Sequence, residues 1–158
     1  MYMQNFTAKD NQLIVDLMTI LALKLILLPR PESDHQVHLA TISIASAART
    51  YINDERLRPA VDSIGEVVKK AVNSDNYIKM AEGNETLKQK LGELKTLLQQ
   101  KTRPVKQKAI SNFFYRFAYK LSSMAGKEFA NIGKHVSADD AGILLWIREI
   151  LEIKEQAL

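Results

Sequence analysis

The sequence contains no cysteine, and this absence excludes disulfide bonds, thiolate metal sites and cysteine nucleophiles. A chain without cysteine suits a reducing compartment. The first ten residues, MYMQNFTAKD, also lack the basic and small-residue pattern of a secretory signal peptide. We therefore expect a cytoplasmic protein.

Glycine and proline are scarce, with six and four copies in 158 residues, so long irregular segments are not expected. Hydrophobic residues make up 46% of the chain, which is enough for one domain with its own core. Residues 1–158 are therefore predicted to form a single domain.

Long apolar runs are absent too. The best membrane candidate, residues 13–28, is sixteen residues long, carries Asp16 and Lys24, and falls short of the roughly 20 residues that a spanning helix needs. Its polar residues gather on one narrow arc of a helical wheel, which is typical of a helix that other helices cover on most sides. Binding at a membrane surface is the alternative, although such helices usually carry a broad basic face.

What the chain does contain is helical periodicity along nearly its whole length, with no alternating run long enough for a strand. The sequence predicts an all-α, compact bundle of six or seven helices. Capping boxes at Thr7 with Asp10 and at Ser33 with Gln36 predict helices over 8–28 and 34–51. Further helices are expected before residue 73, near 75–81, over 85–100, over 104–124 and over 138–156.

The start of the third helix leaves two possibilities open. Asn53 is a favourable N-cap, but Pro59 would then lie too deep in the helix to be free of cost. Either the helix kinks at Pro59, or a short turn over 53–57 precedes a helix that starts there.

Two short stretches share a plan. YINDER and HVSADD each contain a β-branched apolar residue, a capping residue and then acids in the first helical turn. The capping residues, Asn53 and Ser137, lie 84 positions apart. The chain is therefore interpreted as two related helix-loop-helix units with an inserted middle.

With SAARTYINDER and ANIGKHVSADD in the two joints, the sequence resembles the TerB-like family of tellurite-resistance proteins. The family consists of compact all-helical domains built from two such units, and the resemblance covers most of the chain. It implies a non-enzymatic sensing or interaction module that works in stress response or tellurite resistance.

The resemblance also implies a divalent-metal site, in which each unit supplies the Asp of an Asp-Gly pair and acids after the cap. In this sequence those pairs fall on Arg49-Thr50 and Gly133-Lys134, so both aspartates are missing. A hard cation needs six to eight oxygen ligands, so we expect the site to be weakened or absent and no cofactor to be resident. Stabilisation of helix N-termini is the alternative role for the remaining acids. These acids are Asp54, Glu55, Asp139 and Asp140.

A second metal hypothesis concerns DHQVH, which places His35 and His38 three residues apart with Asp34 nearby. Two imidazoles and a carboxylate can bind a transition metal. A solvated first helical turn explains the same residues.

Positive charge is concentrated in residues 101–127, which hold seven Lys or Arg and no Asp or Glu. A basic helix face with aromatics suits single-stranded nucleic acid or an acidic partner. A solvated helix back, with its tyrosines lying on neighbouring helices, is the alternative. The residues predicted on this basic surface are Lys108, Tyr115, Arg116, Tyr119 and Lys120.

No Gly-rich phosphate loop, zinc helix or nucleophile elbow is present in the sequence, so we expect no enzymatic activity. The partners expected are a protein or a small apolar ligand held between helices. The small residues along 34–51 leave open whether that helix packs internally or against a second copy of the chain.

Overall fold

A computed structural model describes residues 5–28, 31–75, 79, 83–124 and 138–153 of the chain. Every regular element in these ranges is helical, which confirms the all-α prediction. The elements are α1 (Ala8–Leu25), α2 (Asp34–Tyr51), the 3-10 helix η1 (Glu55–Leu57), α3 (Arg58–Val72), α5 (Asn84–Lys101), α6 (Pro104–Met124) and α7 (Ala138–Ile150).

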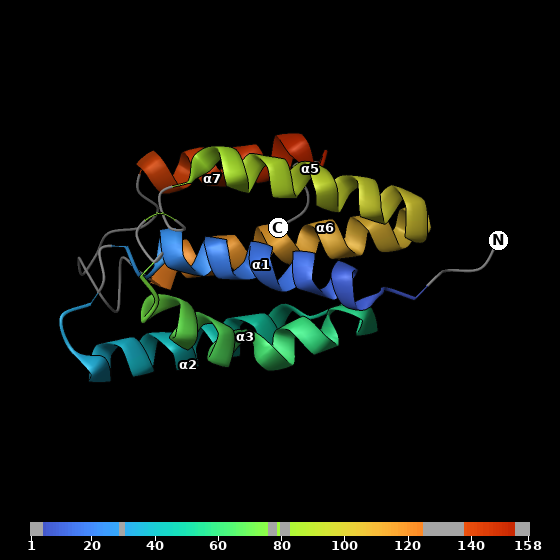
Figure 1. Ribbon diagram of the computed structural model, residues 1–158. Coiled ribbons are helices and arrows are strands. Elements are labelled where there is room, and N and C mark those ends of the chain that lie inside the picture. Colours follow the sequence, from blue (N-terminus) through green and yellow to red (C-terminus); the bar gives the residue numbers. More distant parts are fainter. Residues whose placement is uncertain (1–4, 29–30, 76–78, 80–82, 125–137, 154–158) are drawn as a thin grey trace.

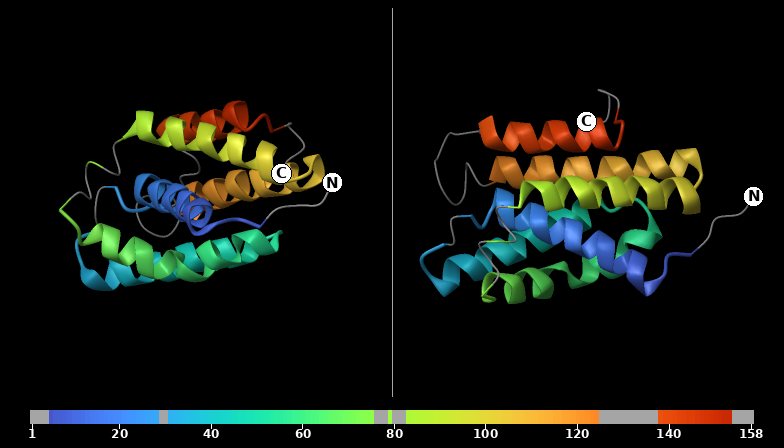
Figure 2. Two further views of the ribbon diagram at one scale, coloured as in Figure 1. Left: turned by 45° about the vertical axis from the view of Figure 1, so that its right-hand side comes forward. Right: turned by 45° about the horizontal axis from the view of Figure 1, so that its top comes forward.

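The helices stack in three layers of two (Figure 1). α1 and α6 form the middle layer, α2 and α3 cover one side of it, and α5 and α7 cover the other. The left view in Figure 2 shows the same order. Buried residues from all six helices join in one hydrophobic core. The middle-layer helices therefore bury apolar residues toward two neighbours at once.

The position of α1 explains its composition. Because this helix is covered on both sides, apolar residues fill most of its circumference, and Leu17, Met18 and Leu21 are fully buried. Thr19, from its narrow polar arc, is also buried, and its hydroxyl donates to the carbonyl oxygen of Val15 at 2.7 Å. Within the described residues no helix has both the length and the apolar character needed to cross a membrane.

Polar contacts along α1 and α5 show that these two helices run antiparallel. Lys101, at the end of α5, reaches Asp10 at the start of α1 with an Nζ to Oδ2 distance of 2.5 Å. At the other end, the Nζ of Lys24 donates to the Oδ1 of Asn84 at 2.6 Å. These contacts join the middle layer to the layer of α5 and α7.

The helix starts predicted from capping boxes are confirmed. Thr7 and Asp10 exchange side-chain to backbone hydrogen bonds of 3.1 and 2.8 Å, and Ser33 and Gln36 form the second box. α1 ends at Leu25 rather than at residue 28. The amides of Ile26 and Leu27 still donate to the carbonyls of Ala22 and Leu23, and Pro29 has no amide N–H with which to extend this series.

At the third helix the second of the two alternatives is correct. η1 forms a short turn, and α3 follows at Arg58 with Pro59 in its first turn, where a missing N–H costs little. The prediction that Asn53 caps a helix is wrong. Asp54 caps η1 instead, because its carboxylate accepts from the backbone N–H of Arg56 at 2.9 Å.

The later helices follow the predicted apolar stripes. Leu87, Leu91, Leu94 and Leu98 of α5 are buried, as are the three phenylalanines of α6. α7 ends at Ile150, earlier than predicted, and a turn continues to Ile153. The helix predicted near 75–81 and the joint over 125–137, with Ser137 as its cap, lie outside the described residues apart from Asp75 and Lys79.

Candidate functional site

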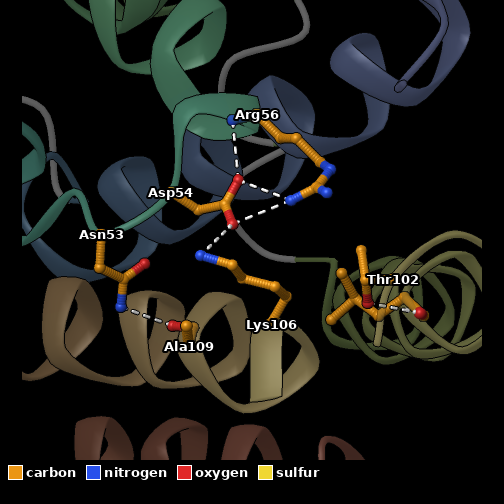
Figure 3. A network of polar contacts seen from close by, with 7 residues as sticks. Asn53, Asp54, Arg56, Thr102, Lys106 and Ala109 are labelled. Carbon is orange, nitrogen blue, oxygen red and sulfur yellow. Dashed lines mark hydrogen bonds and ion pairs between the residues drawn. The ribbon is translucent and has the colours of Figure 1, made fainter. Parts of the chain in front are cut away.

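The acidic joint between α2 and α3 holds a closed network around Asp54 (Figure 3). Both carboxylate oxygens lie 2.9 Å from Nη1 of Arg56, and Nζ of Lys106 lies 3.8 Å from Oδ2. The Asp54 side chain is only 3% exposed. Two protein cations therefore stand where a metal ion would have to approach this carboxylate.

The same network links three parts of the chain. The guanidinium of Arg56 lies over the ring of Phe6, 5.7 Å from its centroid, and thereby contacts the segment before α1. Asn53, instead of capping a helix, donates from Nδ2 to the carbonyl oxygen of Ala109 in α6 at 2.7 Å (Figure 3). The joint thus fastens α2 and η1 to the middle layer.

The other predicted metal ligands do not gather around Asp54. Glu55 points to solvent with 86% of its side chain exposed, and it pairs with Arg58 at 3.6 Å. Asp139 and Asp140 belong to the first turn of α7, in the layer of α5, and Asp140 is half-buried. The side chain of Asp139 and the pair Gly133-Lys134 lie outside the described residues.

The direction of α7 places that first turn at the far end of the bundle from Asp54. Trp146 contacts Lys88 and Glu152 contacts Lys95, so α7 runs parallel to α5 and begins beside the start of α5. The start of α5 lies beside the end of α1, whereas Arg56 lies beside the segment before α1. Asp140 therefore lies at the other end of the bundle from Asp54 and cannot share an ion with it.

Within the described residues, the histidine pair is not joined by a third metal ligand either. His35 and His38 are both exposed at the start of α2. Among the residues that the structure describes, no group of three or more histidine, aspartate or glutamate side chains is arranged to hold a metal ion.

The predicted basic surface on α6 is present only in part. Lys108, Arg116, Tyr119 and Lys120 are exposed, but Tyr115 is buried, at 7% exposure. Its ring lies beneath the guanidinium of Arg148 in α7, at 6.0 Å, and beside the ring of Tyr119, at 6.5 Å between centroids. Placing Tyr115 on an exposed face is therefore a wrong prediction, because α7 covers that turn of α6.

A cleft of about 530 Å³ opens where the second half of α5, the first half of α6 and the end of α7 meet. One predicted residue, Lys108, lines it. The lining combines apolar side chains with amides, a hydroxyl and three charged groups. The other lining residues are Lys95, Leu98, Gln99, Pro104, Gln107, Ser111, Asn112, Leu151, Glu152 and Ile153.

The wall of the cleft formed by α7 has an unusual backbone conformation. Glu152 adopts φ = 56°, the left-handed region that favours glycine. The amides of Glu152 and Ile153 donate to the carbonyls of Glu149 and Arg148 at 3.3 and 2.9 Å, which closes the end of α7 as a Schellman turn. Glu152 is held there by an ion pair with Lys95. The hydrogen bond from Lys95, together with its charge, lowers the pKa of the Glu152 carboxyl.

The wall formed by α6 carries polar groups that are not paired within the described part of the chain. Ser111 is only 6% exposed, lines the cleft, and its hydroxyl has no hydrogen-bond partner among the described residues. Buried hydroxyls usually have such a partner. Ser122, also buried on α6, follows that rule and donates to the carbonyl of Ala118 at 3.0 Å.

The sequence held a partial signal for this cleft. Ser111 and Asn112 follow Lys108 by three and four residues, so a helical reading of 104–124 places them on one face. Lys95 and Glu152 carry no such signal, because only the packing of α7 beside α5 brings them together. The cleft was therefore not predicted from the sequence.

No family model, curated protein or solved structure matches this chain. Its function must therefore be inferred from the geometry of its own residues.

Proposed function

We propose that this chain is a non-enzymatic binding module that holds a small ligand in the cleft between α5, α6 and the end of α7. The observation that carries the proposal is the cleft itself. Its volume of about 530 Å³ lies within the range of roughly 300–1,000 Å³ that is typical of small-molecule sites. Its apolar lining residues, Leu98, Pro104, Leu151 and Ile153, can contact the apolar part of a ligand, and the more numerous polar residues can orient it.

The cleft supports binding better than catalysis. Its lining includes no histidine and only one carboxylate, Glu152, which is already paired with Lys95. A general base needs a free group with a pKa near the working pH, whereas this carboxylate has a lowered pKa.

The resemblance to TerB-like proteins supports a sensing role in stress response or tellurite resistance, and a cytoplasmic location is in keeping with it. Within this proposal the family's metal is replaced by protein cations at the first joint, since Arg56 and Lys106 neutralise Asp54. Ligand sensing would then depend on the cleft and not on a metal ion.

A second function, binding of nucleic acid or an acidic partner through the 101–124 helix, is favoured by the exposure of Arg116, Lys120 and Tyr119. It has less support, because the burial of Tyr115 removes one of the two rings available for stacking on bases. Gel shifts with single-stranded DNA and RNA at low and high salt test it. Binding that persists in Arg116→Glu with Lys120→Glu would exclude this surface.

An NMR fragment screen on the whole chain tests the main proposal. Fragments should shift amide signals of residues that line the cleft, and Asn112→Tyr, which fills the cleft from its rim, should remove those shifts. Lys120→Tyr, on an exposed part of the same helix, is the matched control and should leave them unchanged. If no fragment shifts the cleft signals of the unmodified chain, the proposed function is wrong.

A further inference from the structure

The charges that line the cleft do not cancel. Two lysines and one glutamate leave one excess positive charge, and Glu152 is already paired with Lys95. The remaining lysine, Lys108, is exposed and has no acidic partner among the described residues. The ammonium group of Lys108 is therefore the charge that the cleft offers to a ligand.

Neutral hydrogen-bond donors lie on the same face of α6 as Lys108. The hydroxyl of Ser111 and the amide of Asn112 are three and four residues further along the helix, and both side chains line the cleft without a partner in the described part of the chain. The positive end of α6 lies at Pro104, which also lines the cleft. Lys108, Ser111 and Asn112 therefore form one row of donors along the wall of the cleft, and the start of α6 adds positive potential at one end of it.

The size of the excess charge indicates which anion fits. The single charge of one unpaired ammonium compensates the single charge of a carboxylate. A phosphate dianion carries two negative charges, so one of them would remain uncompensated. The cleft lining also includes no arginine, the residue that binds phosphate in a bidentate manner. Leu98, Leu151 and Ile153 line the rest of the cleft and offer an apolar surface to the remainder of the ligand.

We propose that the ligand of this cleft is a small monocarboxylate with a short hydrocarbon chain. Its carboxylate accepts from Lys108, Ser111 and Asn112, and its chain lies against Leu98 and the end of α7. This inference rests on the proposed binding function and names its ligand class.

Octanoate is a suitable probe, compared with octanol, octylamine and octyl phosphate by NMR titration of the whole chain. Octanoate should shift the cleft amides and bind about tenfold tighter than octanol, because a charged hydrogen bond contributes more than a neutral one. Its affinity should fall with added salt, since the lysine is exposed. Equal or tighter binding of octanol, octylamine or octyl phosphate would overturn the carboxylate assignment.

Two variants test the residues. Lys108→Gln should weaken octanoate binding about tenfold and leave octanol binding unchanged, whereas Lys120→Gln, on the same helix but outside the cleft, should change neither. Equal octanoate affinity in Lys108→Gln and in the unmodified chain would refute the role of this lysine.

The two proposals fail in different ways. If octanol or another fragment enters the cleft and octanoate does not, the carboxylate inference is wrong and the binding function stands. If neither octanoate nor any fragment shifts the cleft signals, both proposals are wrong.

Discussion

The acidic joint and the cleft are opposite kinds of polar region in one bundle. At the joint, Asp54 is buried and paired with Arg56 and Lys106. In the cleft, Lys108 and Ser111 line an open volume with no partner among the described residues. A cluster of acidic residues is therefore a poor guide to a binding site when lysine or arginine residues of the same chain form ion pairs with it. We expect unsatisfied donors beside a cavity to be a better guide.

Both regions depend on the first half of α6. Lys106 reaches Asp54, while Lys108, two residues later and so about 200° further around the helix, lines the cleft. One stretch of helix thus fastens the joint with one side and forms the wall of the cleft with another. Four predictions, ordered from the largest expected effect to the smallest, test this contrast.

The largest effect is expected at the closed network. Asp54→Ala should lower the free energy of unfolding by about 3–5 kcal/mol, because it removes a buried carboxylate that pairs with the largely buried guanidinium of Arg56 and caps η1. Its neighbour supplies the control. Glu55→Ala should change stability by less than about 0.5 kcal/mol, since that side chain is solvated. Urea denaturation measures both, and equal losses for the two variants would refute the structural role of Asp54.

The ion pair between Asp10 and Lys101 should also stabilise the fold, by less than the network around Asp54 does. Asp10→Asn should lower stability at neutral pH by about 1–2 kcal/mol, because it weakens the capping box and the contact between α1 and α5.

The pH dependence of this second effect has a definite sign. Although burial raises the pKa of Asp10, the hydrogen bonds from Lys101 and Thr7 outweigh it and lower the pKa. A lowered carboxyl pKa contributes stability that is present at neutral pH and lost as the pH falls through the folded-state value. The gap between the unmodified chain and Asp10→Asn should therefore close in acid, and a gap that widened there would contradict the assignment.

The third prediction compares two buried serines of α6. Ser111→Ala should leave stability unchanged or raise it by up to about 1 kcal/mol, because its hydroxyl lacks a partner in the described structure. Ser122→Ala should lower stability by about 0.5–1.5 kcal/mol, since it loses the bond to Ala118. Thermal or urea unfolding decides between these signs. A larger loss at Ser111 than at Ser122 would show that the hydroxyl is structurally paired.

The smallest effect is expected from hard divalent cations. Ca²⁺ and Mg²⁺ should not shift the melting temperature, because the Asp54 carboxylate is already paired with Arg56 and Lys106 and Glu55 points away from it. A cation bound at about 100 times its dissociation constant would stabilise the fold by roughly 2.7 kcal/mol. A saturable shift that disappears in Asp54→Asn would therefore show that the joint does hold a metal ion.

Much of the fold was predictable because its signals are local. The capping boxes at Thr7 and Ser33 act within four residues, and the leucine stripe of α5 depends only on helical spacing. The ends of α1 and α7 were predicted too late, and the two errors in residue roles arose where distant elements competed for a residue. Asn53 binds α6 in place of its own helix, and α7 covers Tyr115.

The sequence by itself determined that this chain forms helices, where most of them begin, and which faces they bury. The tertiary structure decided which charges meet. The reason is range: capping and periodicity act within a few residues, whereas Asp54 meets Lys106 and Lys95 meets Glu152 only after helices distant in sequence have packed. The packing of α6 therefore pairs the acid of the joint with Lys106, and the packing of α7 beside α5 and α6 forms the cleft.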